Sequence, residues 1–145
     1  MLPPHRSYDH KIHIEGPEGP ESLGYSLLRH QSTLELQEMK WFLEENLQRG
    51  FIEPSQSPFA LSILFVKKPS GALRFCVDYR KLNNLTRKDR YPLLLISETI
   101  ARLSKAKVYT KLDIRQVFHW IRMDLSSEEL TTFRTRYGAY KCKVL

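Results

Sequence analysis

The feature that most constrains the fold is a turn between two strand-forming runs near the middle of the chain. The runs Leu61–Lys67 and Leu73–Asp78 are rich in apolar, β-branched and aromatic residues, and Pro69-Ser70-Gly71 between them has the chemistry of a tight turn. The pattern predicts a β-hairpin with Lys67 and Lys68 just before its tip.

A helix is predicted immediately before this hairpin. Ser32 followed by Glu35 fits a capping box, in which the hydroxyl and the carboxylate satisfy backbone N–H groups at the helix start. Gly50 supplies the left-handed conformation that ends a helix. Between them, apolar residues at spacings of three and four form one stripe along the helix: Leu36, Met39, Leu43 and Leu47.

Three further elements can be predicted outside this helix and hairpin. Leu94–Leu103 has apolar residues at helical spacing, and Lys107–Asp113 alternates like a strand that ends in a carboxylate. Phe133–Tyr137 and Ala139–Leu145 are expected to form a second hairpin around Gly138. Residues 1–30 are interrupted by prolines and glycines, so we expect an irregular N-terminal arm.

The formal charge of +7 is concentrated rather than evenly spread. Concentrated positive charge attracts phosphate-rich partners, although a charge run can equally be a solvated surface. The segment from Gln31 to Pro54 is net acidic. The densest basic stretch carries Lys67, Lys68, Arg74, Arg80, Lys81, Arg87, Lys88 and Arg90.

Several classes of protein are disfavoured by the sequence. Charged residues interrupt every apolar stretch, so no membrane span and no membrane partner are expected. The first residues lack the apolar region of a secretory signal. The two cysteines, Cys76 and Cys142, do not suggest a disulfide framework, and we therefore expect a reduced, intracellular setting. A zinc site built from these cysteines with His10 and His13 fits no ligand spacing.

Asp113 is the candidate metal ligand. A carboxylate at the end of a strand offers the hard oxygen atoms that suit Mg²⁺, and the backbone carbonyl of Ile114 could add another. A lone aspartate at a strand end can also be a cap or a surface residue, and the residues alone leave both readings open.

The order of motifs along the chain resembles that of gypsy-type (metavirus) LTR retrotransposon reverse transcriptases. The first catalytic motif of that family is similar to the segment from Tyr109 to Arg115 followed by Phe118-His119. The remaining matches are collinear and cover nearly the whole chain. They are Leu2-Pro3-Pro4-His5-Arg6, Tyr8-Asp9-His10, Gly50-Phe51-Ile52, Pro54-Ser55, Ser57-Pro58, Leu64 to Lys68, Gly71, Leu73 to Arg80, Leu82-Asn83, Arg90-Tyr91-Pro92-Leu93, Thr132 to Thr135 and Tyr137-Gly138.

The resemblance implies an α+β fold, an incomplete right-hand polymerase with reverse-transcriptase fingers and the first part of the palm. Residues 31–145 would form the partial domain: 31–90 the fingers helix and hairpin, 91–121 the start of the palm, and 122–145 the return to the fingers. The palm strand would lack its neighbours, which leaves an edge and apolar side chains uncovered, so we expect a marginally stable, aggregation-prone product.

The resemblance also implies a role for individual residues in two-metal nucleotidyl transfer. Asp113 and the carbonyl of Ile114 would bind Mg²⁺, and Arg80 would lie near the template strand. The incoming deoxynucleoside triphosphate would be held by Lys68, Arg74, the backbone amides of Gln116 and Val117, and Phe118 as the gate against a ribose 2′-hydroxyl. The partners would be an RNA or DNA template-primer, deoxynucleoside triphosphates and the remainder of the pol polyprotein.

Three functions remain open at this point. The 145 residues contain no Tyr-x-Asp-Asp motif, so we expect the chain alone to be inactive as an RNA-directed DNA polymerase. The first alternative is a non-catalytic, basic nucleic-acid-binding relic, and the second is the product of a decayed element with no function. Tyr79, Tyr91 and Phe75 could stack on bases or be core residues, and Arg80 could form an ion pair with Asp78 instead of a template contact. His119 is expected to pack or cap.

Overall fold

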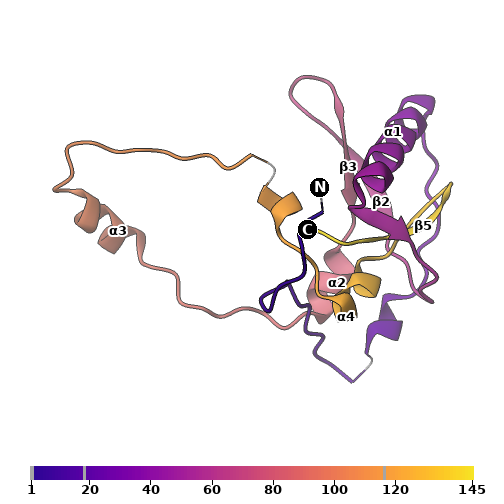
Figure 1. Cartoon of the computed structure of the whole chain (residues 1–145), viewed down its shortest axis with the longest axis horizontal. Coiled ribbons are helices and arrows are strands. Elements are labelled where there is room, and N and C mark those ends of the chain that lie inside the picture. The colour runs from indigo at the N-terminus through magenta and orange to yellow at the C-terminus, as the bar shows by residue number, and fades with distance from the viewer. Residues whose placement is uncertain (1, 18, 116) are drawn as a thin grey trace.

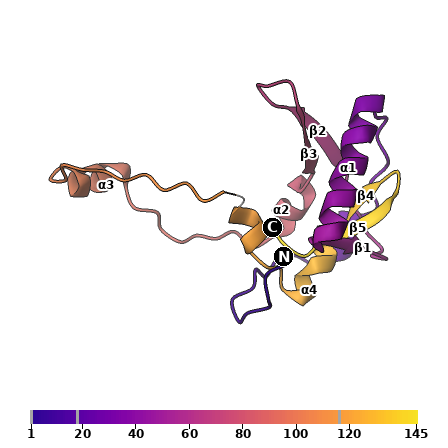
Figure 2. The ribbon, with the colours of Figure 1, turned by 45° about the horizontal axis from the view of Figure 1, so that its top comes forward.

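The computed structural model describes residues 2–17, 19–115 and 117–145. They form a body of helices and antiparallel strands from which one long arm projects (Figures 1 and 2). In chain order the elements are η1 (Pro20–Leu23), α1 (Thr33–Arg49), β1 (Ile52–Pro54), β2 (Ile63–Lys67), β3 (Leu73–Val77), α2 (Arg80–Leu85), α3 (Ile96–Leu103), η2 (Val117–Trp120), α4 (Leu125–Glu128), η3 (Glu129–Thr131), β4 (Phe133–Thr135) and β5 (Gly138–Cys142).

Helix α1 has both of its predicted ends. The Ser32 hydroxyl accepts a hydrogen bond from the backbone N–H of Glu35, and the Glu35 carboxylate accepts one from the backbone N–H of Ser32 at 2.8 Å. Gly50 ends the helix with a φ of 71°, and its N–H is bonded to the carbonyls of Asn46 and Leu47. The capping box and the glycine stop are therefore confirmed.

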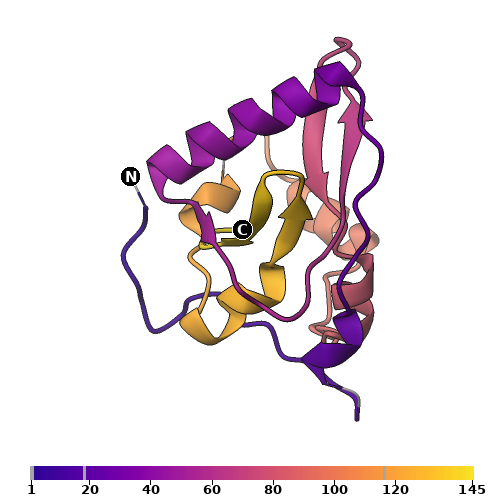
Figure 3. The same cartoon turned by 90° about the vertical axis from the view of Figure 1, so that its right-hand side faces the viewer.

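The strands form two separate antiparallel sheets. β2 and β3 pair as the predicted hairpin, with Phe65 opposite Phe75 and Lys67 opposite Leu73. The second sheet has the order β1-β5-β4, in which β4 and β5 form the predicted C-terminal hairpin and β5 returns to pair with β1, Ile52 opposite Cys142. The end of the chain thus lies beside the segment that follows α1 (Figure 3).

The main core lies where α1 meets both sheets. Met39 and Leu43 on the inner face of α1 pack with Ile52, Ile63 and Phe133, and all five side chains are buried. The Phe75 ring stacks on Phe42 with centroids 4.0 Å apart and meets Phe133 edge-on at 5.5 Å. Such aromatic contacts add to the free energy of apolar burial.

The N-terminal residues are irregular but attached to the body at several points. Isolated β-bridges join His10 to Met123, Ile14 to Thr86 and Tyr25 to Ala60. Leu23, within η1, is fully buried in a second core cluster. These contacts hold the described residues of the N-terminal segment against the body.

The arm comprises residues 87–115, and every one of them is exposed. Helix α3 confirms the predicted helix, and its two ends differ from the expectation by two residues or fewer. The predicted strand Lys107–Asp113 is wrong, because this segment is irregular and has no backbone hydrogen bond to any described residue. A strand requires a neighbour to accept and donate its ladder bonds, and no described segment lies beside this one.

None of the helices within the described residues is long and apolar enough to span a bilayer.

Candidate nucleic-acid interface and polymerase motif

The β2–β3 hairpin presents basic side chains at its tip and on its outer face. Phe65 and Phe75 are cross-strand partners whose side chains pack into the core, so the next pair along the ladder, Val66 and Arg74, lies on the opposite face. Both are exposed. At the turn, the Lys68 backbone N–H donates to the Ala72 carbonyl at 2.8 Å and Gly71 has a φ of 84°. Arg74 and Lys68 are thus held at the outer end of the hairpin.

Lys67 and Lys68 have different surroundings despite being adjacent. Lys67 is the last residue of β2 and alternates onto the same face as Phe65, the face that packs against α1. The pKa of Glu35 at the start of α1 is lowered mainly by its hydrogen bonds with Ser32, and the positive charge of Lys67 contributes as well. Lys67 therefore lies toward α1, whereas Lys68 belongs to the tip.

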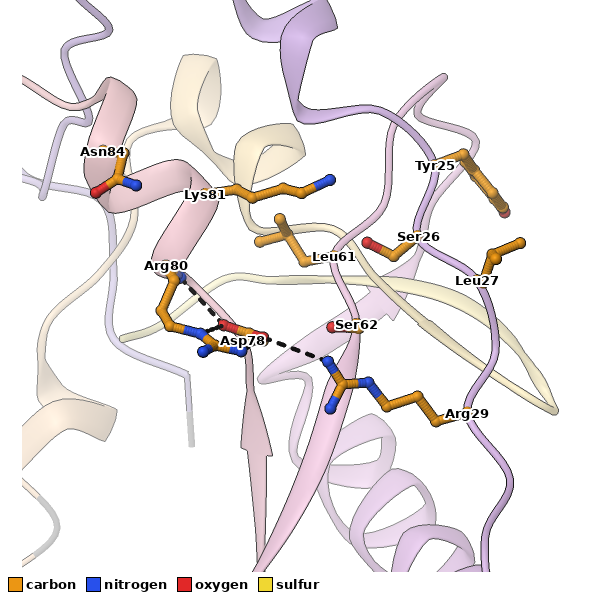
Figure 4. Close-up of a pocket in the computed structure, with 10 residues that line it drawn as sticks. All are labelled: Tyr25, Ser26, Leu27, Arg29, Leu61, Ser62, Asp78, Arg80, Lys81 and Asn84. Carbon is orange, nitrogen blue, oxygen red and sulfur yellow. Dashed lines mark hydrogen bonds and ion pairs between the residues drawn. The ribbon is translucent and has the colours of Figure 1, made fainter.

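Arg80 lies at the mouth of a pocket of about 600 Å³ at the base of the hairpin, here named the Asp78 pocket. Its lining combines the extended segment after η1, the end of β3 and the start of α2 (Figure 4). The basic residues outnumber the single carboxylate, so the pocket is net positive. It is lined by Tyr25, Ser26, Leu27, Arg29, Leu61, Ser62, Asp78, Arg80, Lys81 and Asn84.

The Asp78 carboxylate forms ion pairs with two arginines, Arg80 and Arg29. Arg80 donates from Nε to Oδ1 at 2.8 Å and from Nη2 to Oδ2 at 2.7 Å, and the Arg29 guanidinium approaches Oδ2 at 3.8 Å (Figure 4). The hydrogen bonds from Arg80 lower the pKa of Asp78 to about 2. The ion pair considered for Arg80 is therefore present, and it fixes the guanidinium while most of the side chain remains exposed. The template contact stays a prediction.

Sequence reasoning missed the contribution of the N-terminal segment to this pocket. Arg29 and Tyr25 come from the stretch expected to be an irregular arm, and the Arg134 guanidinium lies 4.7 Å from the centroid of the Tyr25 ring. Tyr25 is placed by its bridge to Ala60. That pairing joins two irregular segments and has no sequence pattern, so only the basic and aromatic residue types could have hinted at it.

The residues of the resembled catalytic motif are not gathered into one site. Asp113 and Ile114 lie near the end of the exposed arm, and Asp113 forms no hydrogen bond or ion pair with Lys68, Arg74 or any other described residue. Val117 and Phe118 lie in η2 and are also exposed. Gln116 lies outside the described residues. Asp113 therefore does not stand at the end of a strand among the described residues, contrary to the prediction for Lys107–Asp113.

The described residues do not fit a magnesium ion at Asp113. No group of three or more carboxylate, imidazole or thiol side chains that could hold a metal occurs in residues 2–17, 19–115 and 117–145. Mg²⁺ requires near-octahedral oxygen ligation, which one exposed carboxylate cannot supply. The same finding gives no support to zinc binding by the histidines and cysteines.

The remaining aromatic candidates have structural surroundings. The His119 ring packs against Phe51 with centroids 4.8 Å apart, and burial lowers its pKa. Phe75 is part of the core, and the Tyr79 hydroxyl lies 3.7 Å from the Cys142 thiol. Packing is thus confirmed for His119 and Phe75, while Tyr91 on the arm is 79% exposed.

Residues 66–145 match the family described as reverse transcriptase (RNA-dependent DNA polymerase). The chain belongs to the reverse transcriptase family. The match begins within β2 and includes Arg74, Arg80, the arm and the C-terminal hairpin.

Relatives of this reverse transcriptase chain include polyproteins of mobile elements. The transposon Tf2-3 and Tf2-4 polyproteins of Schizosaccharomyces pombe (strain 972) are each 33% identical to it over 110 residues, which is 76% of this chain and 8% of each polyprotein. The chain therefore spans less than a tenth of the curated relatives that it matches.

Solved structures show the same fold at lower identity. A Prototype Foamy Virus protease-reverse transcriptase crystal structure has a TM-score of 0.71 at 20% identity, with 84% of this chain and 16% of that chain covered. A foamy viral protease-reverse transcriptase in complex with dsDNA has a TM-score of 0.68 at 18% identity, covering 99% and 31%. The predicted fold class, an α+β part of the reverse-transcriptase polymerase fold, is confirmed.

Proposed function

We propose that this chain is the N-terminal part of the polymerase of a gypsy-type LTR retrotransposon, carried within a longer pol polyprotein. In that setting the polymerase would copy an RNA or DNA template into DNA from deoxynucleoside triphosphates. The match of residues 66–145 to the reverse transcriptase family and the similarity to transposon polyproteins support the proposal. An intracellular location, where these substrates occur, is part of it.

The proposed subdomains follow the arrangement of the body and the arm. Residues 31–90 would be the fingers helix and hairpin, 91–121 the start of the palm, and 122–145 the return to the fingers, with 1–30 as the N-terminal arm. The pairing of β5 with β1 supports the return, since it brings residues 138–142 back to the segment that follows α1.

Lys68 and Arg74 would bind the phosphates of the incoming nucleotide. The hairpin register supports this assignment because it turns Arg74 away from the core and leaves Lys68 at the tip, while Lys67 lies toward α1. A guanidinium offers a planar fork of donors to phosphate oxygens, and a lysine ammonium offers a mobile point charge. Val117, Phe118 and Gln116 would complete the nucleotide site through backbone amides and the steric gate.

Arg80 would contact the template strand from the Asp78 pocket. The observation that carries this part of the proposal is that Arg29 and Arg80 both pair with the Asp78 carboxylate and that Lys81 lines the same pocket. Because Asp78 engages one edge of the Arg80 guanidinium, the side chain has a fixed direction and its remaining donors face solvent. A net positive pocket with ordered donors suits a phosphodiester backbone.

Asp113 and the Ile114 carbonyl are proposed as magnesium ligands only in a longer polypeptide that supplies further carboxylates. In the described residues Asp113 stands alone on the arm, so this chain by itself is expected to lack polymerase activity. The residues of this chain would instead bind and orient nucleic acid and the phosphates of the nucleotide.

Nucleic-acid binding by the whole chain tests the proposal. Anisotropy of a labelled template-primer should show binding that weakens steeply with salt, and Lys68→Ala, Arg74→Ala and Arg80→Ala should each weaken it several-fold. Lys40→Ala, on the exposed face of α1, is the matched control and should have little effect. Equal effects for all four variants would contradict the proposal. Primer extension with Mg²⁺ should give no product, and product that disappears in Asp113→Ala would contradict the expected inactivity.

A non-catalytic nucleic-acid-binding protein is the second candidate. The net positive Asp78 pocket favours it, because contacts to phosphates need no metal ion. To distinguish the polymerase from the non-catalytic binding protein, the 145-residue chain is extended at its C-terminus to include the remaining motifs of the family. Restored extension that depends on Asp113 favours the polymerase, and binding that never leads to extension favours the second candidate.

A further inference from the structure

Arg122 carries a buried guanidinium that contacts both the N-terminal segment and α4. Its side chain is 7% exposed, and its Nε and Nη1 atoms have no hydrogen-bond partner among the described residues. The Glu128 carboxylate approaches Nη2 at 3.5 Å, and that Oε1 atom also forms no hydrogen bond to a described residue. A buried charge is stable only where hydrogen-bond acceptors replace the lost water, so the fold depends on the acceptors that reach this guanidinium.

His5 supplies a hydrogen-bond acceptor to Arg122 from 117 positions earlier in the chain. Its Nε2 atom lies 2.9 Å from Nη2 of Arg122. Because a guanidinium only donates, Nε2 must accept, and the imidazole must carry its proton on Nδ1. That Nδ1 lies 2.6 Å from Oδ2 of Asp9, a carboxylate whose side chain is 7% exposed. A neutral imidazole thus joins a carboxylate of its own segment to a guanidinium of the body.

A second proton on His5 would break only one of these two contacts. The proton must bind Nε2, the atom that faces Arg122, so the acceptor is lost and two cations oppose each other. The bond from Nδ1 to Asp9 is kept, and the positive charge strengthens it. That bond is local, since the Asp9 backbone N–H also donates to the Arg6 carbonyl at 3.2 Å within the same turn. Protonation therefore exchanges a tertiary contact for a local one.

Charged groups from several parts of the chain surround this contact. The carboxylates among them attract an imidazolium at His5, whereas Arg122 repels it, so the cost of protonation falls on the contact between His5 and Arg122. The electrostatic influence of His5 reaches α4, because hydrogen bonds with Ser126 are the main cause of the lowered pKa of Asp124 and the charges of Lys11 and His5 contribute to it. The surrounding charged side chains are Arg6, Asp9, Lys11, Asp124 and Glu128.

The segment that carries His5 forms one wall of two pockets that share Trp120. The larger pocket has a volume of about 440 Å³ and joins the segment to Phe51 and Trp120. The second pocket joins the segment to Trp120 and Arg122. The next attachment along the chain is a backbone bond, in which the His10 N–H donates to the Arg122 carbonyl at 2.7 Å. Release of the segment up to that bond would therefore uncover Phe51 and Trp120.

We propose that His5 is a pH-sensitive latch: as a neutral imidazole it holds residues 2–9 against Arg122, and as an imidazolium it releases them. The released state exposes the aromatic wall formed by Phe51 and Trp120. Helix α1 and both sheets stay folded, because the main core between them is built from other residues. The latch requires neither template nor nucleotide, so it can be tested apart from the proposed polymerase function.

Backbone dynamics of the whole chain test the release. The N–H order parameters of Ser7 and Tyr8, measured by nitrogen-15 relaxation, should be about 0.85 at pH 7.5, as in a rigid backbone, and below about 0.6 at pH 5. The order parameters within α1 should be the same at both pH values, which would show that the body remains folded. Unchanged order at Ser7 and Tyr8 would overturn the proposal.

Substitutions at His5 separate the titration of this ring from general effects of acid. His5→Gln keeps an acceptor near the position of Nε2 and does not titrate, so the order parameters should stay high at both pH values. His5→Lys supplies a permanent cation and should give the low values at both. His30→Gln, which removes an exposed histidine that lines neither pocket, is the matched control and should retain the pH response. A pH response that persists in His5→Gln, or an ordered segment in His5→Lys, would refute the latch.

Discussion

The Arg80 guanidinium binds the Asp78 carboxylate through two parallel hydrogen bonds of 2.8 and 2.7 Å, two residues apart at the junction of β3 and α2. This fork geometry is the strong form of the arginine–carboxylate pair. It fixes the direction of Arg80 at the mouth of a positively charged pocket, and Arg29 supports the same carboxylate from the N-terminal segment.

Acidification should weaken the fold through Asp78. Its pKa is lowered from 3.8 to about 2 in the folded chain, so its contribution to stability is fully present above pH 3.8 and is lost as the pH falls toward 2. We expect no more than about 1 kcal/mol, because the exposed Arg80 side chain is screened by solvent. Urea unfolding at pH 5, 3.5 and 2.5 checks this. Asp78→Asn should remove that part of the pH dependence, whereas Asp89→Asn on the arm should not.

The two faces of α1 should respond differently to truncation. Met39→Ala removes a fully buried side chain from the main core and should lower the free energy of unfolding by about 2–5 kcal/mol. Trp41→Ala, on the exposed face, should change it by no more than about 0.5 kcal/mol. Chemical denaturation followed by circular dichroism measures both. Similar losses for the two variants would mean that α1 is rotated from the orientation described.

Lys141 in β5 should contribute more to stability than Lys143, which follows the strand. Its ammonium lies 2.6 Å from Glu129, 3.1 Å from Glu53 and 3.8 Å from the buried Glu128, and the hydrogen bond to Glu129 raises the pKa of Lys141. Lys141→Met leaves three carboxylates without this cation and should destabilise the fold by about 2 kcal/mol or more. Lys143→Met, which removes a pair with Glu53 alone, is the control and should cost about 1 kcal/mol or less. Thermal unfolding at pH 7 compares them.

Arg29 should contribute to nucleic-acid binding although it lies outside the resembled motifs. Arg29→Ala is expected to weaken binding of single-stranded RNA or DNA several-fold and to reduce the slope of log affinity against log salt by about 0.7–1. Titrations at several salt concentrations measure both quantities. Arg6 is a basic residue of the same N-terminal segment that does not line the Asp78 pocket, so Arg6→Ala should leave the slope unchanged.

Short-range sequence patterns were sufficient to predict the ends of α1 and the turn of the β2–β3 hairpin. The Ser32–Glu35 capping box and Gly50 fixed the ends of α1, and Pro69-Ser70-Gly71 fixed the hairpin turn, because caps and turns depend on residues a few positions apart. The family could be inferred in the same way, since its motifs are ordered stretches of sequence.

Tertiary structure alone decided which of these elements found partners. The alternation in Lys107–Asp113 is typical of a strand, but a strand forms only where another segment completes its hydrogen bonds, and none of the described residues does so. The Asp78 pocket likewise depends on Tyr25 pairing with Ala60 across thirty-five residues, a contact without a sequence signature. Sequence determined the local conformations of this protein, while long-range packing determined which side chains meet.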